Sequence, residues 1–178
     1  EYPNFLFRFT AKILYPLADG IVFQTQEAMN YFSQSVQKKS RIILNPVDEV
    51  FFNTPLKEER RGIVTTGRLV KQKNHALLIK AYSTIADKVE DDLYIYGEGE
   101  LQEELEKLIN DLGVKNRVHL PGAVRNVPEV LSNAKLFVLS SDYEGMPNSL
   151  MEAMAMGLPC ISTDCPCGGP KRLLKSGM

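Results

Sequence analysis

The stretch "KLFVLSSDYEGMPNSLMEAMAMGLPCISTD" (135–164) holds an apolar run, a polar turn, an apolar helical segment and a second short apolar run. The continuous run at 135–141 is typical of a strand buried on both faces. The Met, Ala and Leu residues that follow favour a helix, with Pro147 in its first turn and Gly157 at its end. Residues 159–164 then predict a returning strand. This order predicts two parallel strands joined by a helical crossover.

The same alternation of strand and helix runs through the chain from Arg61 onward. It predicts strands at 62–67, 92–97 and 117–122 and helices at 74–86, 100–113 and 127–134, with another helix beginning at 170. The fold class is therefore α/β, a Rossmann-like parallel sheet with helices on both faces. Ligands bind such sheets beyond the carboxyl ends of the strands, so the turns there are expected to line one crevice. These turns follow Thr66, Tyr96, Leu120 and Ser140.

Residues 1–60 follow a different pattern. Only two strands are predicted, at 18–25 and 41–47, with a helix around 27–32 between them. Two strands cannot bury a core of their own. We therefore interpret 1–47 as a remnant of a preceding domain, 48–60 as a linker, and 61–178 as a Rossmann-like domain that is incomplete at its C-terminus. The absence of an initial Met and the end inside a helix lead us to expect a piece of a longer protein.

The net charge and the cysteine content limit the classes of protein to which this chain could belong. The chain has 178 residues, a net charge of −1 and 24% charged residues, so no basic excess favours nucleic acid as a partner. Its three cysteines, Cys160, Cys165 and Cys167, are odd in number and clustered, which favours a reducing cytoplasm over a disulfide framework. Two of them form Cys-Pro-Cys, which lacks the second ligand pair of a zinc site.

The most apolar N-terminal stretch, at 5–23, carries Arg8, Lys12 and Asp19 and is broken by Pro16. It cannot supply the ~20 uninterrupted apolar residues that span a bilayer, and it lacks the layout of a signal peptide. We expect an amphipathic helix packed on a core.

Two carboxylates flank the helix start in the opening stretch. Glu144 lies in the turn ahead of the helix, and Glu152 lies about one turn inside it. The helix follows a strand, so its first amides, at 148–150, are expected to point into the crevice and to attract phosphate. One acid could then reach a ribose and the other a sugar on the far side of a diphosphate. Two solvated glutamates on an ordinary helix are the alternative.

Two cations follow another strand, in "GRLVKQKNH" (67–75). Arg68 comes directly after the strand, and Lys73 stands five residues later at the start of the next helix. This spacing suits a diphosphate clamp in which Arg68 makes bidentate contacts. A solvated loop is the alternative. The Gly-rich turn "YGEGE" (96–100) permits close approach to a ligand but is weak by itself. His119 alternates inside a strand and is interpreted as structural.

Together these motifs resemble one family, the retaining glycosyltransferases of family 4 (group 1), with the GT-B architecture of two Rossmann-like domains. "EGMPNSLME" (144–152) is similar to the family's E-x7-E signature, and "GRLVKQKN" (67–74) to its Arg/Lys diphosphate motif. "IILNPVDEVFF" (42–52) resembles its Asn-x-Val-Asp segment, and "YGEGE" and "CGGPKRLL" (167–174) resemble its later loops. The resemblance is collinear over almost all of the chain.

The resemblance implies a role for each motif residue. Arg68 and Lys73 would neutralise the diphosphate of a nucleotide-sugar, Glu144 would bind hydroxyls of the donor sugar, and Glu152 would bind the ribose. Of these, Glu144, Arg68 and Lys73 would be the catalytic set. The nucleotide would also contact Gly67, Gly97, Val124 beside the base, and the amides of Asn148, Ser149 and Leu150.

The implied reaction is transfer of a hexose-type sugar, with retention, from a nucleoside diphosphate sugar to a glycan or lipid-linked acceptor in polysaccharide biosynthesis. Uracil is the commoner base in the family. Neither a metal nor another cofactor is expected, because "EDD" (90–92) precedes a strand, where a metal-binding Asp-x-Asp would follow one. Residues 1–47 would belong to the acceptor domain and 61–178 to the donor domain, so this chain alone should transfer no sugar.

Two further contacts and two alternative functions accompany this interpretation. The resemblance allows a peripheral contact with the inner face of a membrane through the rest of the acceptor domain, and the exposed remnant allows a homo-oligomer. A non-catalytic Rossmann-like nucleotide-binding or regulatory module is the alternative to an enzyme. Such a module, however, needs no acidic side chain that binds sugar hydroxyls. A phosphorylase of the same architecture would need pyridoxal phosphate on a lysine, of which the sequence gives no sign.

Overall fold

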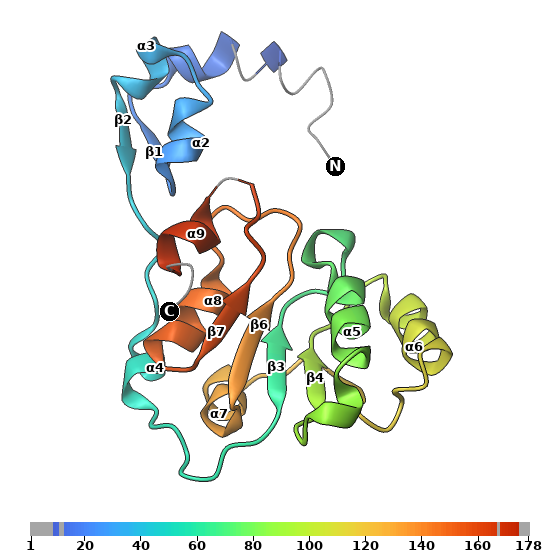
Figure 1. Cartoon of the computed structure of the whole chain (residues 1–178). Helices are drawn as coiled ribbons and strands as arrows, with labels where there is room; N and C mark the ends of the chain where they lie inside the picture. Colours follow the sequence, from blue (N-terminus) through green and yellow to red (C-terminus); the bar gives the residue numbers. More distant parts are fainter. Residues whose placement is uncertain (1–8, 11–12, 167, 175–178) are drawn as a thin grey trace.

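The computed structural model describes residues 9–10, 13–166 and 168–174. Two separate parallel sheets form within them (Figure 1). The larger has five strands in the order β5-β4-β3-β6-β7, and all its pairings are parallel. Its strands are β3 (Ile63–Thr66), β4 (Leu93–Tyr96), β5 (Val118–Gly122), β6 (Leu136–Leu139) and β7 (Cys160–Ser162). The predicted α/β class with a parallel sheet is confirmed.

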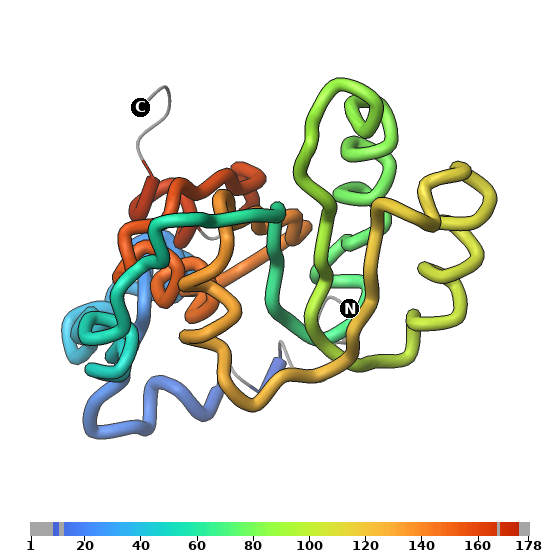
Figure 2. The backbone as a smooth tube through the Cα atoms, turned by 90° about the horizontal axis from the view of Figure 1, so that it is seen from below, coloured from blue at the N-terminus to red at the C-terminus, as the bar shows by residue number. Residues whose placement is uncertain are grey.

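Helices cover both faces of this sheet, and each face has its own apolar core. On one face, α5 (His75–Ser83) and α6 (Gln102–Asp111) pack on β4 and β5 through a buried cluster that includes Ile79, Leu105 and Leu93. On the other, α7 (Val127–Asn133) and α8 (Asn148–Ala155) pack on β3 and β6. Figure 2 shows α6 and α9 (Gly169–Leu173) on opposite sides of the molecule with β3 between them.

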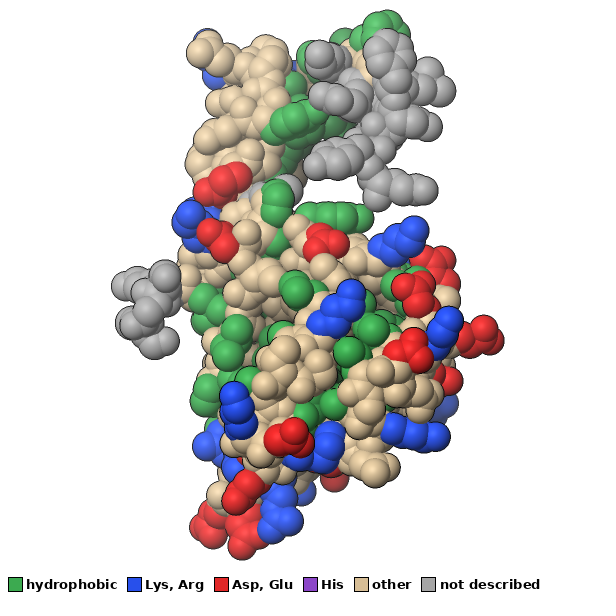
Figure 3. All heavy atoms as spheres, turned by 45° about the vertical axis from the view of Figure 1, so that its right-hand side comes forward, with side chains coloured by type: hydrophobic (Ala, Val, Ile, Leu, Met, Phe, Trp, Pro, Cys, Tyr) green, Lys and Arg blue, Asp and Glu red, His purple; other side chains and the backbone are tan. Residues whose placement is uncertain are grey.

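The smaller sheet pairs β1 (Ile21–Phe23) with β2 (Ser40–Ile42). It carries α2 (Gln26–Asn30) and α3 (Gln34–Gln37), and a 3-10 turn, η1 (Tyr15–Leu17), precedes it. We call residues 13–47 the β1–β2 unit. It lies beyond the carboxyl ends of the larger sheet's strands (Figure 1), and large apolar side chains remain exposed on it, at the top of Figure 3. The second predicted strand is shorter than expected, because pairing with β1 ends at Ile42.

The segment at 48–60 contains an element that its sequence did not predict. Within it, α4 (Glu49–Asn53) is capped at its N-terminus by Asp48, whose side chain accepts a hydrogen bond from the Val50 amide at 2.9 Å. Phe51 is 8% exposed and joins the core beneath α8. Part of the predicted linker is therefore attached to the larger domain, because burying a phenylalanine there removes a large apolar surface from water.

Two short 3-10 turns, η2 (Lys71–Lys73) and η3 (Ala86–Lys88), complete the described elements. Within the described parts of the chain, every helix is too short or too polar to cross a membrane. Residues 5–8 and 11–12 of the apolar N-terminal stretch, and Cys167 of the Cys-Pro-Cys motif, lie outside the described residues. Cys160 and Cys165 are free thiols.

Candidate functional site

A cleft of about 460 Å³ opens where β3 and β6 end. The loop after β3 forms one wall, and the loop after β6 with the start of α8 forms the other. The cleft brings together seven of the residues that the sequence singled out: Gly67, Arg68, Lys73, Glu144, Asn148, Ser149 and Glu152. The two cations and the two acids, which are far apart in the chain, therefore face one space at the carboxyl edge of the sheet.

Two predicted residues, Val124 and Gly97, have other surroundings, whereas Leu150 was predicted to contribute its amide alone. Leu150 is 0% exposed, and its side chain lies in the core, so only its amide could reach the cleft. Val124 lines a separate cavity of about 440 Å³ against Tyr94 and Tyr96. Gly97 packs directly on Gly67, where an added Cβ would lie 1.9 Å from the Gly67 carbonyl oxygen. The glycine at 97 is thus required by the close approach of two loops.

The Lys73 ammonium and the Glu144 carboxylate form an ion pair inside the cleft. Lys73 Nζ lies 2.7 Å from Glu144 Oε1, and their side chains are 17% and 9% exposed. The Ser141 hydroxyl donates to the same carboxylate oxygen at 2.8 Å. A carboxylate that accepts two hydrogen bonds is held in one orientation, so these contacts fix the Glu144 side chain.

The two loops that carry this pair are tied to each other by further hydrogen bonds. Gln72 Nε2 donates to the Tyr143 carbonyl at 2.9 Å, and the Asp142 amide donates to the Gln72 carbonyl at 2.9 Å. The Ser140 hydroxyl donates to the Lys73 carbonyl at 2.9 Å. These bonds make the loops after β3 and β6 one structural unit, which fixes the spacing of the cations and acids.

His75 supports the backbone of Arg68 from beneath. It is 3% exposed, and its Nε2 lies 3.2 Å from the Arg68 carbonyl oxygen. Burial lowers the pKa of His75 to about 4, so the ring is neutral near pH 7 and Nε2 can donate its proton to that carbonyl. Its Nδ1 has no hydrogen-bond partner within the described residues. His75 therefore holds the loop of Arg68 in place.

The start of α8 supplies hydrogen-bond donors. Pro147 precedes the helix and has no capping side chain, and the first amides of a helix lack partners within it. The Ser149 hydroxyl is buried, and no described residue bonds to it. Glu152, one turn further, is half-buried, and burial raises its pKa. This end of the cleft suits a ligand that carries both an anion and hydroxyl groups.

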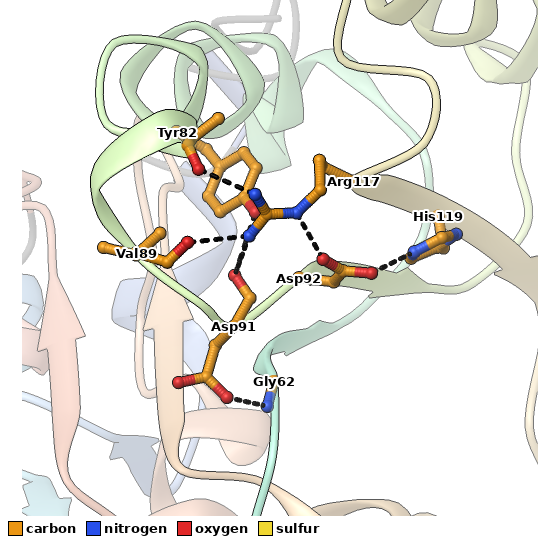
Figure 4. Close-up of polar contacts among 8 residues, drawn as sticks. Gly62, Tyr82, Val89, Asp91, Asp92, Arg117 and His119 are labelled. Atoms are coloured by element: carbon orange, nitrogen blue, oxygen red, sulfur yellow. Dashed lines mark hydrogen bonds and ion pairs between the residues drawn. The ribbon is translucent and has the colours of Figure 1, made fainter.

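The acidic pair Asp91 and Asp92 lies at the other end of the sheet, before β4 (Figure 4). Asp92 pairs with the Arg117 guanidinium at 2.5 Å and with His119 Nε2 at 2.9 Å. Asp91 accepts from the Gly62 amide at 2.8 Å and pairs with Lys135 at 2.8 Å. The interpretation of His119 as structural agrees with this network. Within the described residues, no group of three His, Cys, Asp or Glu side chains is arranged to hold a metal ion.

Sequence reasoning missed several residues of the cleft, chiefly Asn45 and Gln72. Asn45 belongs to the Asn-x-Val-Asp segment, which offered a signal, but nothing in its spacing predicts contact with α8. Gln72 stands between the two lysines of its loop, where a solvated side chain is the ordinary expectation. Both contacts join segments that are distant in sequence.

Comparison with known proteins identifies the family. Residues 46–178 match the family described as Glycosyl transferases group 1. The chain belongs to this family. Over 92% of its length it is 36% identical to an uncharacterized glycosyltransferase of Methanocaldococcus jannaschii, of which it covers 44%. Over 88% of its length it is 33% identical to an N-acetylgalactosaminyltransferase of Campylobacter jejuni that acts on a diphospho-undecaprenol-linked sugar, of which it covers 44%.

Solved glycosyltransferase structures share the fold. The chain superposes on TarM of S. aureus, crystallised with UDP, with a TM-score of 0.82 and 25% identity, covering 95% of this chain and 34% of that one. Alr3699/HepE of Anabaena gives a TM-score of 0.81 at 20% identity, with 96% of this chain and 51% of that one covered. The group 1 glycosyltransferase fold is thereby shown. The chain spans a little under half the length of the curated relatives named above.

Proposed function

We propose that this chain provides the donor side of a retaining glycosyltransferase that takes a sugar, of hexose type, from a nucleoside diphosphate sugar. The acceptor is a glycan or a lipid-linked saccharide. One observation carries the proposal: a single cleft of about 460 Å³ holds Arg68, Lys73, Glu144, Glu152 and the start of α8. Cations and helix amides suit a diphosphate, and carboxylates suit the hydroxyls on either side of it.

In this proposal each wall of the cleft has its own task. The diphosphate gains charge as the sugar leaves, and Arg68, Lys73 and the first amides of α8 stabilise that charge electrostatically. Glu144 accepts hydrogen bonds from the donor sugar, and Glu152 accepts them from the ribose. The residues around the diphosphate already supply positive charge, so the proposal includes no metal ion.

The relatives support the classes of donor and acceptor. The TarM structure contains UDP, and the Campylobacter relative is named for a lipid-linked diphosphate acceptor. We therefore propose a uridine nucleotide as donor and a lipid-linked or polymeric glycan as acceptor. A cytoplasmic location, peripheral contact with a membrane, self-association of the chain and the assignment of 1–47 and 61–178 to acceptor and donor domains stay predictions.

Calorimetric titration of the chain tests the donor. UDP, GDP and ADP are compared with a panel of their sugar conjugates. We expect one nucleoside diphosphate to bind and one of its sugar conjugates to bind more tightly, because Glu144 adds contacts to the sugar. If the chain binds a nucleotide and no sugar conjugate of that nucleotide binds more tightly, the chain would instead be a nucleotide-binding module. Absence of binding for every compound would overturn the proposal.

A further inference from the structure

Three side-chain amides form a chain of hydrogen bonds that ends at the cleft. Gln24 directly follows β1, Asn45 lies between β2 and α4, and Asn148 is the first residue of α8. Gln24 Nε2 donates to Asn45 Oδ1 at 2.5 Å, and Asn45 Nδ2 donates to Asn148 Oδ1 at 2.7 Å. We call these three residues the amide relay. It links the β1–β2 unit to the helix that begins at the cleft.

The direction of these hydrogen bonds decides whether the oxygen or the NH2 group of the Asn148 side chain remains available to bind a ligand. A side-chain amide has one oxygen that accepts and one NH2 group that donates. Because the Asn148 oxygen already accepts from Asn45, its NH2 group is the part that remains for a ligand. Asn45 and Asn148 both line the cleft, and Asn148 is exposed there. The reversed amide would turn an oxygen toward the ligand, and an oxygen repels phosphate.

Two close approaches bring the β1–β2 unit against the loops of the larger domain. A Cβ added to Gly145 would lie 3.2 Å from Gln24 Oε1, and one added to Gly168 would lie 2.9 Å from Glu27 Cδ. Gly145 is in the loop that carries Glu144, and Gly168 directly precedes α9. The relay is therefore part of a wider contact between the β1–β2 unit and these loops.

We propose that Gln24 and Asn45 are positioning residues that hold the Asn148 amide with its NH2 group ready to donate to an anionic oxygen of the bound nucleoside diphosphate. The inference rests on the proposed function and deepens it. The β1–β2 unit, through two side chains, sets the orientation of a donor group in the nucleotide site. Asn45 acts through Asn148 and needs no contact with the ligand.

A double-mutant cycle tests the relay. Asn45→Ala, Asn148→Ala and the double variant are titrated with UDP by calorimetry. Loss of one hydrogen bond to a charged group predicts about tenfold weaker binding for Asn148→Ala, and Asn45→Ala should lose most of that amount. In the double variant the loss should equal that of Asn148→Ala alone, because contacting residues in one network are not additive.

Substitutions that alter the direction of the relay sharpen the test. Asn45→Asp can only accept hydrogen bonds, so it should attract the Asn148 NH2 group, turn its oxygen toward the ligand and weaken UDP binding more than Asn45→Ala does. Gln24→Ala leaves both asparagines in place and should cause a smaller loss. Gln26 and Asn30 offer a matched control, since Gln26 Nε2 donates to Asn30 Oδ1 at 2.8 Å on the exposed side of α2. Gln26→Ala should leave UDP affinity unchanged.

Two results would overturn the relay while leaving the proposed function intact. One is unchanged UDP affinity in Asn45→Ala when Arg68→Ala weakens it. The other is a loss from Asn45→Ala that persists at full size in the Asn148→Ala background, which would indicate a general structural effect. A wild-type chain that binds neither UDP nor another nucleoside diphosphate would overturn the proposed function and the relay together.

Discussion

Lys73 and Glu144, 71 positions apart in the chain, form an ion pair with Nζ and Oε1 separated by 2.7 Å. The lysine is proposed to bind the diphosphate and the glutamate to bind the sugar, and in this structure the two side chains bind each other. Under the proposed function, a bound diphosphate would draw Lys73 away from Glu144 or share it with that carboxylate. The carboxylate would then be available to accept hydrogen bonds from the sugar hydroxyls, and diphosphate binding would be coupled to sugar binding.

Glu144→Gln should separate these two effects. Removing the carboxylate frees Lys73, so UDP should bind as well as before or a few-fold more tightly. The preference for a UDP-sugar over UDP should fall by about tenfold, because the sugar loses a charge-assisted hydrogen bond. Calorimetric titration with both ligands measures the ratio. Glu103→Gln, an exposed acid of α6, is the control. Equal weakening of both ligands by Glu144→Gln would contradict the assignment.

Arg68→Ala should weaken UDP binding by roughly ten- to a hundredfold, since one charge-assisted contact contributes about 1.5–3 kcal/mol. Lys71→Ala is a matched control. Lys71 is a cation of the same loop, but its side chain is exposed and does not line the cleft. Its effect on UDP affinity should be small and should vanish at high salt. If both variants bind UDP alike, the clamp is wrongly assigned.

Glu152 should give UDP binding a dependence on pH. Burial raises the pKa of this half-buried carboxyl, and ribose hydroxyls donate to its ionised form. As pH falls through this raised pKa, Glu152 takes up a proton and UDP affinity should decline, beginning above the ordinary titration range of glutamate. The sign for folding is opposite, because protonation of a group with a raised pKa stabilises the fold. Glu152→Gln should bind UDP more weakly and lose this dependence, which calorimetry at several pH values can detect.

Asp92→Asn should lower stability and leave UDP affinity unchanged. Burial would raise the pKa of Asp92, but hydrogen bonds from His119 and Arg117 outweigh it and lower the pKa. The ionised carboxylate therefore stabilises the fold above the usual Asp range, and this contribution is lost as pH falls through the lowered pKa. Thermal unfolding at pH 7 and at acidic pH should show a difference between wild type and variant that shrinks in acid. Asp111→Asn, an exposed acid at the end of α6, should match wild type at both.

The chain by itself should bind nucleotide and transfer no sugar. Among the described residues, only Asn45 reaches the cleft from the β1–β2 unit, so little is present to orient an acceptor. Orientation of the second substrate can account for ~7–11 kcal/mol of a barrier. A radiolabelled UDP-sugar, offered with glycan and lipid-linked acceptors, should give no product above background. Efficient transfer to any of them would show that the acceptor side is already complete.

Most of the larger domain could be predicted because its signals are local. The apolar run at 135–141, the turn residues and the helix at α8 each follow from residues close together in the sequence, and alternation then dictates parallel strands. The short helix α4 was missed because five residues give little helical periodicity, and its stability comes from Phe51 packing beneath α8.

The candidate site, like the fold, could be predicted only in part from the sequence. The sequence by itself determined which charged side chains lie at the cleft. Arg68, Lys73, Glu144 and Glu152 all come after strands whose carboxyl ends meet at one edge of the sheet. Only the tertiary structure decided that Lys73 pairs with Glu144 and that Asn45 reaches Asn148 across 103 positions. The spacing of apolar residues indicates which face of each helix or strand is buried. Contacts between distant loops depend instead on how strands, helices and the β1–β2 unit pack together in space.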